Sequence, residues 1–405
     1  MQPTLFAFLL SWAIMAQPGE GWRIIGPGGG GAQYIPTISP HDPNHVLVAC
    51  DMTGDYLSKD GGASWRMFNL GEGTREFIWD PKNPEVLYAR GDGLYRSEDG
   101  GRTWGRVYPG GQATIEMAND HADVDYLIDH KPAPRMTAMA VDPNDSNVLL
   151  AGLGTSLFLS RDRGVTWKKE LDLPSAARRV WAAGGALYVA TDRSVWSRRQ
   201  GQWSEGVVRA EAWRDVAAAG EVVYAVGPGG GVVSSDGGRS WDEVKLPGSG
   251  AQLTAVAVSR DFPDTAYAGF RRLRLGERTL FGVARTTDRG KNWELVWSQD
   301  TTAPPNVTDA WITPKLGADW GDEPLSLGVA PSNPDICYAT DLGRTLRTTN
   351  GGKTWQAVYS RPAPNGWTTT GLDVTTAYGV HFDPFDSKRI LISYTDIGPF
   401  LSEDG

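Results

Sequence analysis

One eight-residue pattern recurs along the chain and constrains its fold more than any other feature. A clear copy is "SKDGGASW" at residues 58–65. The other copies are "SEDGGRTW" at 97–104, "SRDRGVTW" at 160–167, "SSDGGRSW" at 234–241, "TTDRGKNW" at 286–293 and "TTNGGKTW" at 348–355, and "SEDG" at 402–405 matches the beginning of another. The pattern predicts a tight turn, in which Asp60 accepts backbone N–H groups while Gly61 and Gly62 supply positive φ values. Trp65 would then begin the next strand and pack its ring between sheets. We expect these aspartates to be structural, because copies distributed around a fold cannot form one active site.

A second pattern, roughly D-P-x-x-P-x-x-x-Y-A, precedes each turn, as in "DPKNPEVLYAR" at residues 80–90. Together the two patterns give seven units between Ser39 and Trp355, each of about 45 residues, the period of a propeller blade. A blade is a four-stranded sheet that hides its faces against its neighbours. The sequence therefore predicts an all-β, seven-bladed β-propeller over residues 20–370. Residues 371–405 begin another repeat; we interpret them as the start of a second propeller, with a closing blade of the first as the alternative.

The net charge limits the classes of partner, and the N-terminal segment indicates where the protein is located. The chain has 39 basic and 48 acidic residues, a net charge of −9, and no basic run. This argues against nucleic acid or an anionic membrane as the partner. Residues 1–16, "MQPTLFAFLLSWAIMA", have an apolar core too short to span a bilayer, and we interpret them as a secretory signal peptide. We therefore expect a secreted protein, extracellular or periplasmic.

The chain has two cysteines, Cys50 and Cys337, in equivalent repeats. Aligned on the aspartates that follow them, they stand an odd number of positions apart, so on a strand they would point to opposite faces. The sequence predicts two buried thiols rather than a disulfide.

Three segments exceed the length that regular blades need: residues 108–136, 296–325 and 359–378. The first contains Asp120, His121, Asp123, Asp125, Asp129 and His130. Their spacing fits no standard metal site, so we predict a solvated acidic loop, with no metal and no cofactor. The other two segments carry Trp311, Trp320 and Trp367 near aspartates. Flat aromatic faces beside hydrogen-bond acceptors are what a sugar-binding cleft needs, so these tryptophans are the candidate substrate-binding residues.

Several common catalytic and binding motifs are missing from the sequence. It contains no Ser-His-Asp order, nucleotide loop, CxxC or HExxH motif. Carboxylates are the best remaining candidates for catalysis, and paired carboxylates indicate glycoside hydrolysis first.

Two short motifs carry a resemblance to a known family. Residues 26–65, which include "CDMTGDY", resemble the opening of the tandem-propeller xyloglucanases, where a TD-(I/V)-GG-x-Y motif holds the general base; Asp51 occupies that position. Residues 367–400, which end in "TDIGPF", resemble the start of the second propeller of that family, where "GDIGGF" holds the general acid; Asp396 falls on it. The chain departs from the family in having Cys50 before the first aspartate, "TG" and "GP" in place of "GG", and "GLDV" in place of "GLEE". The repeated turns are similar to the Asp-box (BNR) repeats, which sialidase-like and sortilin-type propellers share.

The resemblance implies a secreted glycoside hydrolase that acts on a β-glucan or xyloglucan-type plant polysaccharide. In an inverting mechanism Asp51 would activate water and Asp396 would protonate the leaving oxygen, while Trp311, Trp320 and Trp367 stack on sugar rings. The expected partner is a polysaccharide or glycan, with a protein as a further candidate, and neither nucleic acid nor a membrane.

The residues leave two alternatives open. An aspartate after a small residue also stands at Asp192 and Asp341, so Asp51 and Asp396 would alternatively form strand-end turns. The alternative function is a non-catalytic propeller that binds a protein or a glycan.

Overall fold

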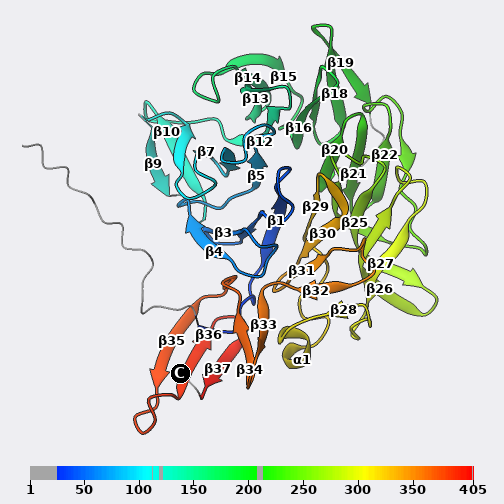
Figure 1. The fold of residues 1–405 in the computed structure, drawn as a ribbon. Coiled ribbons are helices and arrows are strands. Elements are labelled where there is room, and N and C mark those ends of the chain that lie inside the picture. Colours follow the sequence, from blue (N-terminus) through cyan, green and yellow to red (C-terminus); the bar gives the residue numbers. More distant parts are fainter. Residues whose placement is uncertain (1–24, 112, 118–121, 208–212, 404) are drawn as a thin grey trace, which may run out of the picture.

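Antiparallel sheets stand side by side around a central axis (Figure 1). The computed structural model describes residues 25–111, 113–117, 122–207, 213–403 and 405. In this part of the chain the one α-helix is α1 (Ile312–Leu316), and the prediction of an all-β fold is confirmed. The predicted signal peptide lies outside the described residues.

The described part of the ring consists of six four-stranded sheets and one five-stranded sheet. In chain order, the first four-stranded sheet contains β1 (Gln33–Ile38), β2 (Val46–Cys50), β3 (Gly54–Ser58) and β4 (Arg66–Asn69), and the second contains β5 (Glu76–Trp79), β6 (Leu87–Arg90), β7 (Leu94–Ser97) and β8 (Gly105–Tyr108). The third contains β12 (Met136–Asp142), β13 (Asp145–Leu153), β14 (Ser156–Ser160) and β15 (Lys168–Asp172), and the fourth contains β16 (Arg179–Ala183), β17 (Ala186–Ala190), β18 (Ser194–Arg199) and β19 (Gln202–Val207). The fifth contains β20 (Asp215–Ala219), β21 (Val222–Gly227), β22 (Gly230–Ser234) and β23 (Asp242–Glu243), and the sixth contains β24 (Gln252–Val258), β25 (Ala266–Leu275), β26 (Arg278–Thr286) and β27 (Glu294–Gln299). The five-stranded sheet contains β29 (Ser326–Ala330), β30 (Asn333–Thr340), β31 (Thr345–Thr348) and β32 (Trp355–Ala357), with β28 (Val307–Thr308) parallel to β32.

Three smaller sheets complete the described elements. They are β9 (Thr114–Met117), β10 (Val124–Ile128) and β11 (Lys131–Pro132); the hairpin β33 (Ser360–Ala363) and β34 (Gly366–Thr369); and β35 (Ala377–Phe382), β36 (Ile390–Tyr394) and β37 (Gly398–Ser402).

Each ring sheet is buried on both faces, which explains its apolar inner strands. In β2 every residue is buried. Val46, Val48 and Cys50 pack into one core cluster, whereas Leu47 and Ala49 pack into another. Side chains alternate between the two faces of a strand, so consecutive residues contact different neighbouring sheets.

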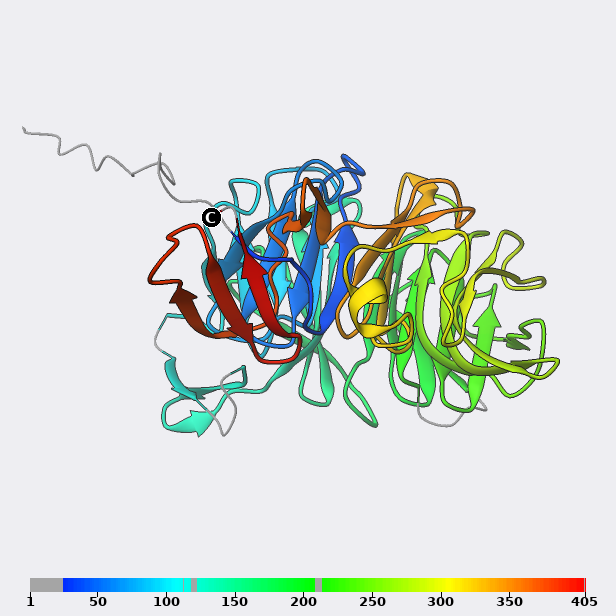
Figure 2. The same cartoon turned by 90° about the horizontal axis from the view of Figure 1, so that it is seen from below.

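The ring closes between the first sheet and the five-stranded sheet, whose strands stand together in the side view (Figure 2). The N–H of Gln33 donates to the carbonyl of Asp341 at 3.1 Å. Nε1 of Trp65 donates to the carbonyl of Val358 at 2.9 Å. The two ends of the ring are therefore joined by hydrogen bonds as well as by apolar packing.

The repeated turns have the geometry that their residues predict. Oδ1 of Asp60 accepts the N–H of Ser64 at 2.8 Å, and Gly61 and Gly62 have φ values of 71° and 92°. In a later copy, hydrogen bonds from Thr166 and Ser160 lower the pKa of Asp162 to about 2. An acid so committed to its own turn is a poor proton donor at neutral pH, which supports the structural interpretation.

Cys50 and Cys337 are both free and buried. They belong to different core clusters. The prediction of two buried thiols is confirmed.

The sheet β35–β37 lies outside the ring (Figure 1). Exposed apolar side chains stand on both of its faces: Val380 and Phe382 on one, Leu391 and Leu401 on the other. The assignment of residues 371–405 to a second propeller stays a prediction.

Candidate active site

A glycine-rich segment, residues 26–31, lies between the ring and the segment that leads to β35. The N–H of Gly29 donates to the carbonyl of Leu372 at 2.6 Å, and the N–H of Gly30 donates to that of Gly343 at 3.0 Å. Gly28 has a φ of 73°, and a Cβ there would stand 2.0 Å from the carbonyl oxygen of Tyr359. Only glycine can occupy position 28, because a side chain would collide with this oxygen and the positive φ disfavours other residues.

Asp51 follows β2 and is exposed. Its N–H donates to the carbonyl of Ala32, directly after the glycine-rich segment, at 3.3 Å. Burial raises the pKa of nearby Tyr34, and the charge of Asp51 raises it further while that of Arg214 lowers it. Asp51 thus stands at the end of the ring where β1 begins, within electrostatic range of Tyr34.

Asp396 is exposed in the turn between β36 and β37. Its Oδ2 accepts the hydroxyl of Thr375 at 3.3 Å. The next residue, Ile397, packs on Gly30, where a Cβ would meet its Cγ2 at 2.9 Å. Asp51 and Asp396 therefore flank the same glycine-rich segment, one through Ala32 and the other through Ile397.

The contact between the glycine-rich segment 26–31 and residues 371–397 forms a junction. Asp373 is a third carboxylate at this junction, and the sequence did not single it out. Its Oδ2 accepts the hydroxyl of Thr369 at 2.8 Å, and its carbonyl accepts the hydroxyl of Tyr56. Burial raises the pKa of Asp373 to about 6. Burial also raises the pKa of Tyr56, with additional contributions from the charges of Cys50, Asp373, Asp55 and Asp51. Asp373 lies in "GLDV", and this departure from the family motif was the available signal.

The three candidate tryptophans lie in different surroundings. Trp311 and Trp367 line a groove of about 370 Å³ together with Lys315 and Phe400. Trp311 is 3% exposed, its Nε1 donates to the carbonyl of Gly28 at 2.9 Å, and its ring meets Phe400 edge to face. Trp367 is 37% exposed and offers the larger free face. Trp320 is partly buried against the core and does not line this groove.

The strand-end alternative is realised at Asp341. This carboxylate is fully buried, accepts the N–H groups of Gly343 and Arg344 at 2.9 and 2.7 Å, and also accepts Nε of Arg344 at 2.7 Å. Asp192 instead pairs with Arg178 at 2.6 Å. Asp51 and Asp396 differ from Asp341 in being exposed, so the shared motif does not give them a shared environment.

In the acidic loop, Asp123 and Asp125 pair with Arg75 and Arg135 at 2.6 and 2.8 Å. Asp120 and His121 lie outside the described residues. Within the described part of the chain no group of three or more His, Cys, Asp or Glu side chains is placed to hold a metal ion. No helix among the same residues is long and apolar enough to cross a membrane.

The chain has relatives among curated proteins. No family model matches the chain. The xyloglucanase Xgh74A of Acetivibrio thermocellus is 25% identical over 392 residues, which cover 86% of this chain and 41% of that protein. The chain is similar to xyloglucanases. A probable oligoxyloglucan-reducing end-specific xyloglucanase of Neosartorya fischeri is 24% identical over 305 residues, 65% of this chain and 36% of that protein. The chain thus spans less than half the length of these curated relatives.

Solved structures of GH74 enzymes share the fold. An ancestral GH74 enzyme superposes with a TM-score of 0.65 at 18% identity, covering 95% of this chain and 54% of that one. The GH74 xyloglucanase of Xanthomonas campestris gives 0.66 at 19% identity, covering 94% and 60%. The resemblance to the tandem-propeller xyloglucanases that the motifs predict is confirmed, and so is the propeller fold.

Proposed function

We propose that this protein is a secreted glycoside hydrolase that acts on a xyloglucan-type β-glucan with inversion at the anomeric carbon. The observation that carries the proposal is the junction itself: Asp51 and Asp396, far apart in the sequence, flank one glycine-rich segment. The similarity to xyloglucanases supports the substrate class.

The two carboxylates take different roles in this proposal. Asp51 is the base that activates water, and Asp396 is the acid that protonates the leaving oxygen. An inverting pair needs a separation of about 6.5–9.5 Å, which leaves room for the water. Asp373 adds a group at the junction that exchanges a proton near neutral pH, since burial raises its pKa to about 6.

The groove lined by Trp311 and Trp367 supports a place for sugar rings next to this junction. Trp367 supplies the exposed face. A sugar ring can stack on such a face without any charged group, which suits a neutral glucan. Residues 371–405 would belong to a second propeller that forms the other side of the cleft.

The test is release of reducing ends from xyloglucan, mixed-linkage β-glucan and xylan. We expect activity on xyloglucan first, and we expect Asp51→Asn and Asp396→Asn each to lower turnover by about 10²–10⁴-fold. Asp129→Asn is the matched control: Asp129 is exposed with a φ of 50°, a conformation that asparagine tolerates.

Unchanged turnover in both variants would overturn the catalytic assignment. Polymer that stays intact while the protein still binds it would favour the non-catalytic binding propeller instead.

A further inference from the structure

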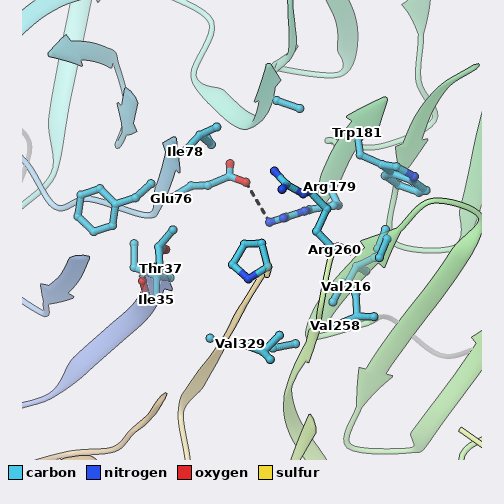
Figure 3. A pocket seen from close by; sticks show the side chains of 18 of the residues that line it. Ile35, Thr37, Glu76, Ile78, Arg179, Trp181, Val216, Val258, Arg260 and Val329 are labelled. Carbon is cyan, nitrogen blue, oxygen red and sulfur yellow. Dashed lines mark hydrogen bonds and ion pairs between the residues drawn. The ribbon is translucent and has the colours of Figure 1, made fainter. Parts of the chain in front are cut away.

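The ring encloses an axial cavity of about 810 Å³ (Figure 3). Its walls are the first strands of the sheets, which line it with apolar side chains such as Ile35, Ile78, Val180, Val216 and Val258 and also with charged side chains near the strand ends. A concave site of this size that combines apolar walls with polar groups is typical of small-ligand sites.

Charged groups gather at one end of this cavity, where the first strands begin. We call this end the axial mouth and define it by Glu76, Arg178, Arg179, Arg214 and Asp215. Asp51 lies at the same end of the ring, because Cys50 pairs with Gln33 at the beginning of β1.

The two carboxylates of the axial mouth are already satisfied. Glu76 accepts Arg179 at 3.1 Å across the cavity wall (Figure 3), as well as Arg90 at 3.0 Å and the N–H of Met139 at 3.1 Å. Asp215 accepts two backbone N–H groups, at 2.8 and 2.9 Å. Both therefore hold neighbouring sheets together.

The arginines of the axial mouth are not all satisfied. Arg179 pairs with Glu76, and Arg178 pairs with Asp192 at 2.6 Å. Arg75, which also lines the cavity, pairs with Asp123 at 2.6 Å. Arg214 is exposed, and among the described residues its guanidinium has neither a hydrogen bond nor an ion pair. In a chain of net charge −9, this guanidinium lines the cavity without an ion-pair partner among the described residues, although its charge acts on the neighbouring Asp215.

We propose that the axial mouth binds the carboxylate of an acidic sugar, with Arg214 as the pairing group. The planar guanidinium presents a fork of donors that matches a carboxylate in a bidentate geometry. One unpaired cation suits a monoanion, since Glu76 and Asp215 would repel a second negative charge. The apolar part of the wall accommodates the flat face of a sugar ring.

Tyr34 links the axial mouth to the candidate active site. Burial raises the pKa of Tyr34, the charge of Asp51 raises it further and that of Arg214 lowers it, so both charges lie within electrostatic range of its hydroxyl. An acidic unit at Arg214 could therefore belong to a glycan that continues toward Asp51. The binding site does not itself depend on hydrolysis, so it can exist whether or not the proposed function holds.

The experiment is calorimetric titration of the full chain with glucuronate and, separately, with an oligosaccharide that carries one glucuronic acid unit. Glucose is the neutral counterpart, and inorganic phosphate is the dianionic one. We expect glucuronate to bind, glucose and phosphate to bind much more weakly, and the affinity to fall with added salt.

Two variants that each lose one positive charge distinguish specific binding at Arg214 from a general electrostatic effect. Arg214→Gln should weaken glucuronate binding by about tenfold or more. Arg102→Gln should not, because Arg102 is exposed in the turn between β7 and β8, at the opposite end of the sheet.

Tighter binding of the oligosaccharide than of free glucuronate would identify a glycan as the source of the acidic unit, and equal binding would identify the free sugar acid. Absence of saturable binding, equal affinity in Arg214→Gln and the unaltered protein, or preference for phosphate would each overturn the proposal. Hydrolysis of neutral xyloglucan reports separately on the proposed function.

Discussion

Asp55 gives the most quantitative prediction. It lies in β3, is 1% exposed, and accepts the hydroxyl of Thr74 at 2.8 Å through Oδ2, while its Oδ1 has no hydrogen-bond partner among the described residues. Burial raises the pKa of Asp55 to about 8, and the charge of Glu72 adds to the rise. The folded protein therefore holds a proton on Asp55 that the unfolded chain has lost above about pH 4.

The sign of the effect on stability follows from this proton. Between the unfolded pKa of about 3.9 and the folded value, the native state binds one more proton than the unfolded state, so the free energy of unfolding falls as pH rises. The slope is about 1.4 kcal/mol per pH unit for one proton, which amounts to about 3–4 kcal/mol between pH 5 and pH 8.

The perturbation is Asp55→Asn, which keeps the shape and removes the titration. The amide leaves buried donors without partners, and this costs about 1–3 kcal/mol at every pH. We therefore expect the variant to be less stable than the unaltered protein at pH 5 and to gain on it by about 3–4 kcal/mol by pH 8. The assay is urea unfolding followed by tryptophan fluorescence at pH 5, 6, 7 and 8. Glu72 is present in both proteins, so its own titration largely cancels in the difference.

The size of the difference in unfolding free energy at one pH does not test whether Asp55 is protonated, but the change of that difference with pH does. A difference in unfolding free energy that stays flat from pH 5 to pH 8 would refute the buried, protonated state of Asp55. Asp129→Asn serves as the control, because it makes the same substitution at an exposed position.

Three further changes test the packing. Trp355→Ala removes a side chain that is 1% exposed, so we expect a loss of about 3–5 kcal/mol in urea unfolding. Gly28→Ala places a Cβ 2.0 Å from the carbonyl oxygen of Tyr359 at a φ of 73°; we expect a lower thermal midpoint, and an unchanged midpoint would show that the segment is free to move. Arg344→Met leaves the buried carboxylate of Asp341 without its cation, so we expect a loss of about 3–5 kcal/mol, and a loss below 1 kcal/mol would contradict the ion pair.

The fold could be predicted from the sequence because the repeated turns are held by interactions between residues that are close in the sequence. Asp60, Gly61 and Gly62 contain nearly everything that the turn needs within a few residues. The apolar strands between turns then had to be buried on both faces, and only packing against neighbouring sheets achieves that. The opposite orientation of Cys50 and Cys337 followed from side-chain alternation alone.

The junction was harder to predict, because its contacts join distant segments. Asp373 acquires its environment from Thr369, which is near in sequence, but also from Tyr56 in another sheet. Trp311 likewise donates its Nε1–H to the carbonyl of Gly28, which is distant in the sequence. The unpaired state of Arg214 is a property of the assembled ring and has no signature in the sequence.

The most direct measurement of the proposed mechanism is the configuration of the first product. Xyloglucan is hydrolysed in an NMR tube, and the anomeric proton signals of the new reducing end are followed before mutarotation. We expect the α-anomer to appear first from the β-linked backbone, and Asp51→Asn to abolish its appearance. Initial release of the β-anomer, or product formed at an undiminished rate by Asp51→Asn, would contradict the proposed mechanism.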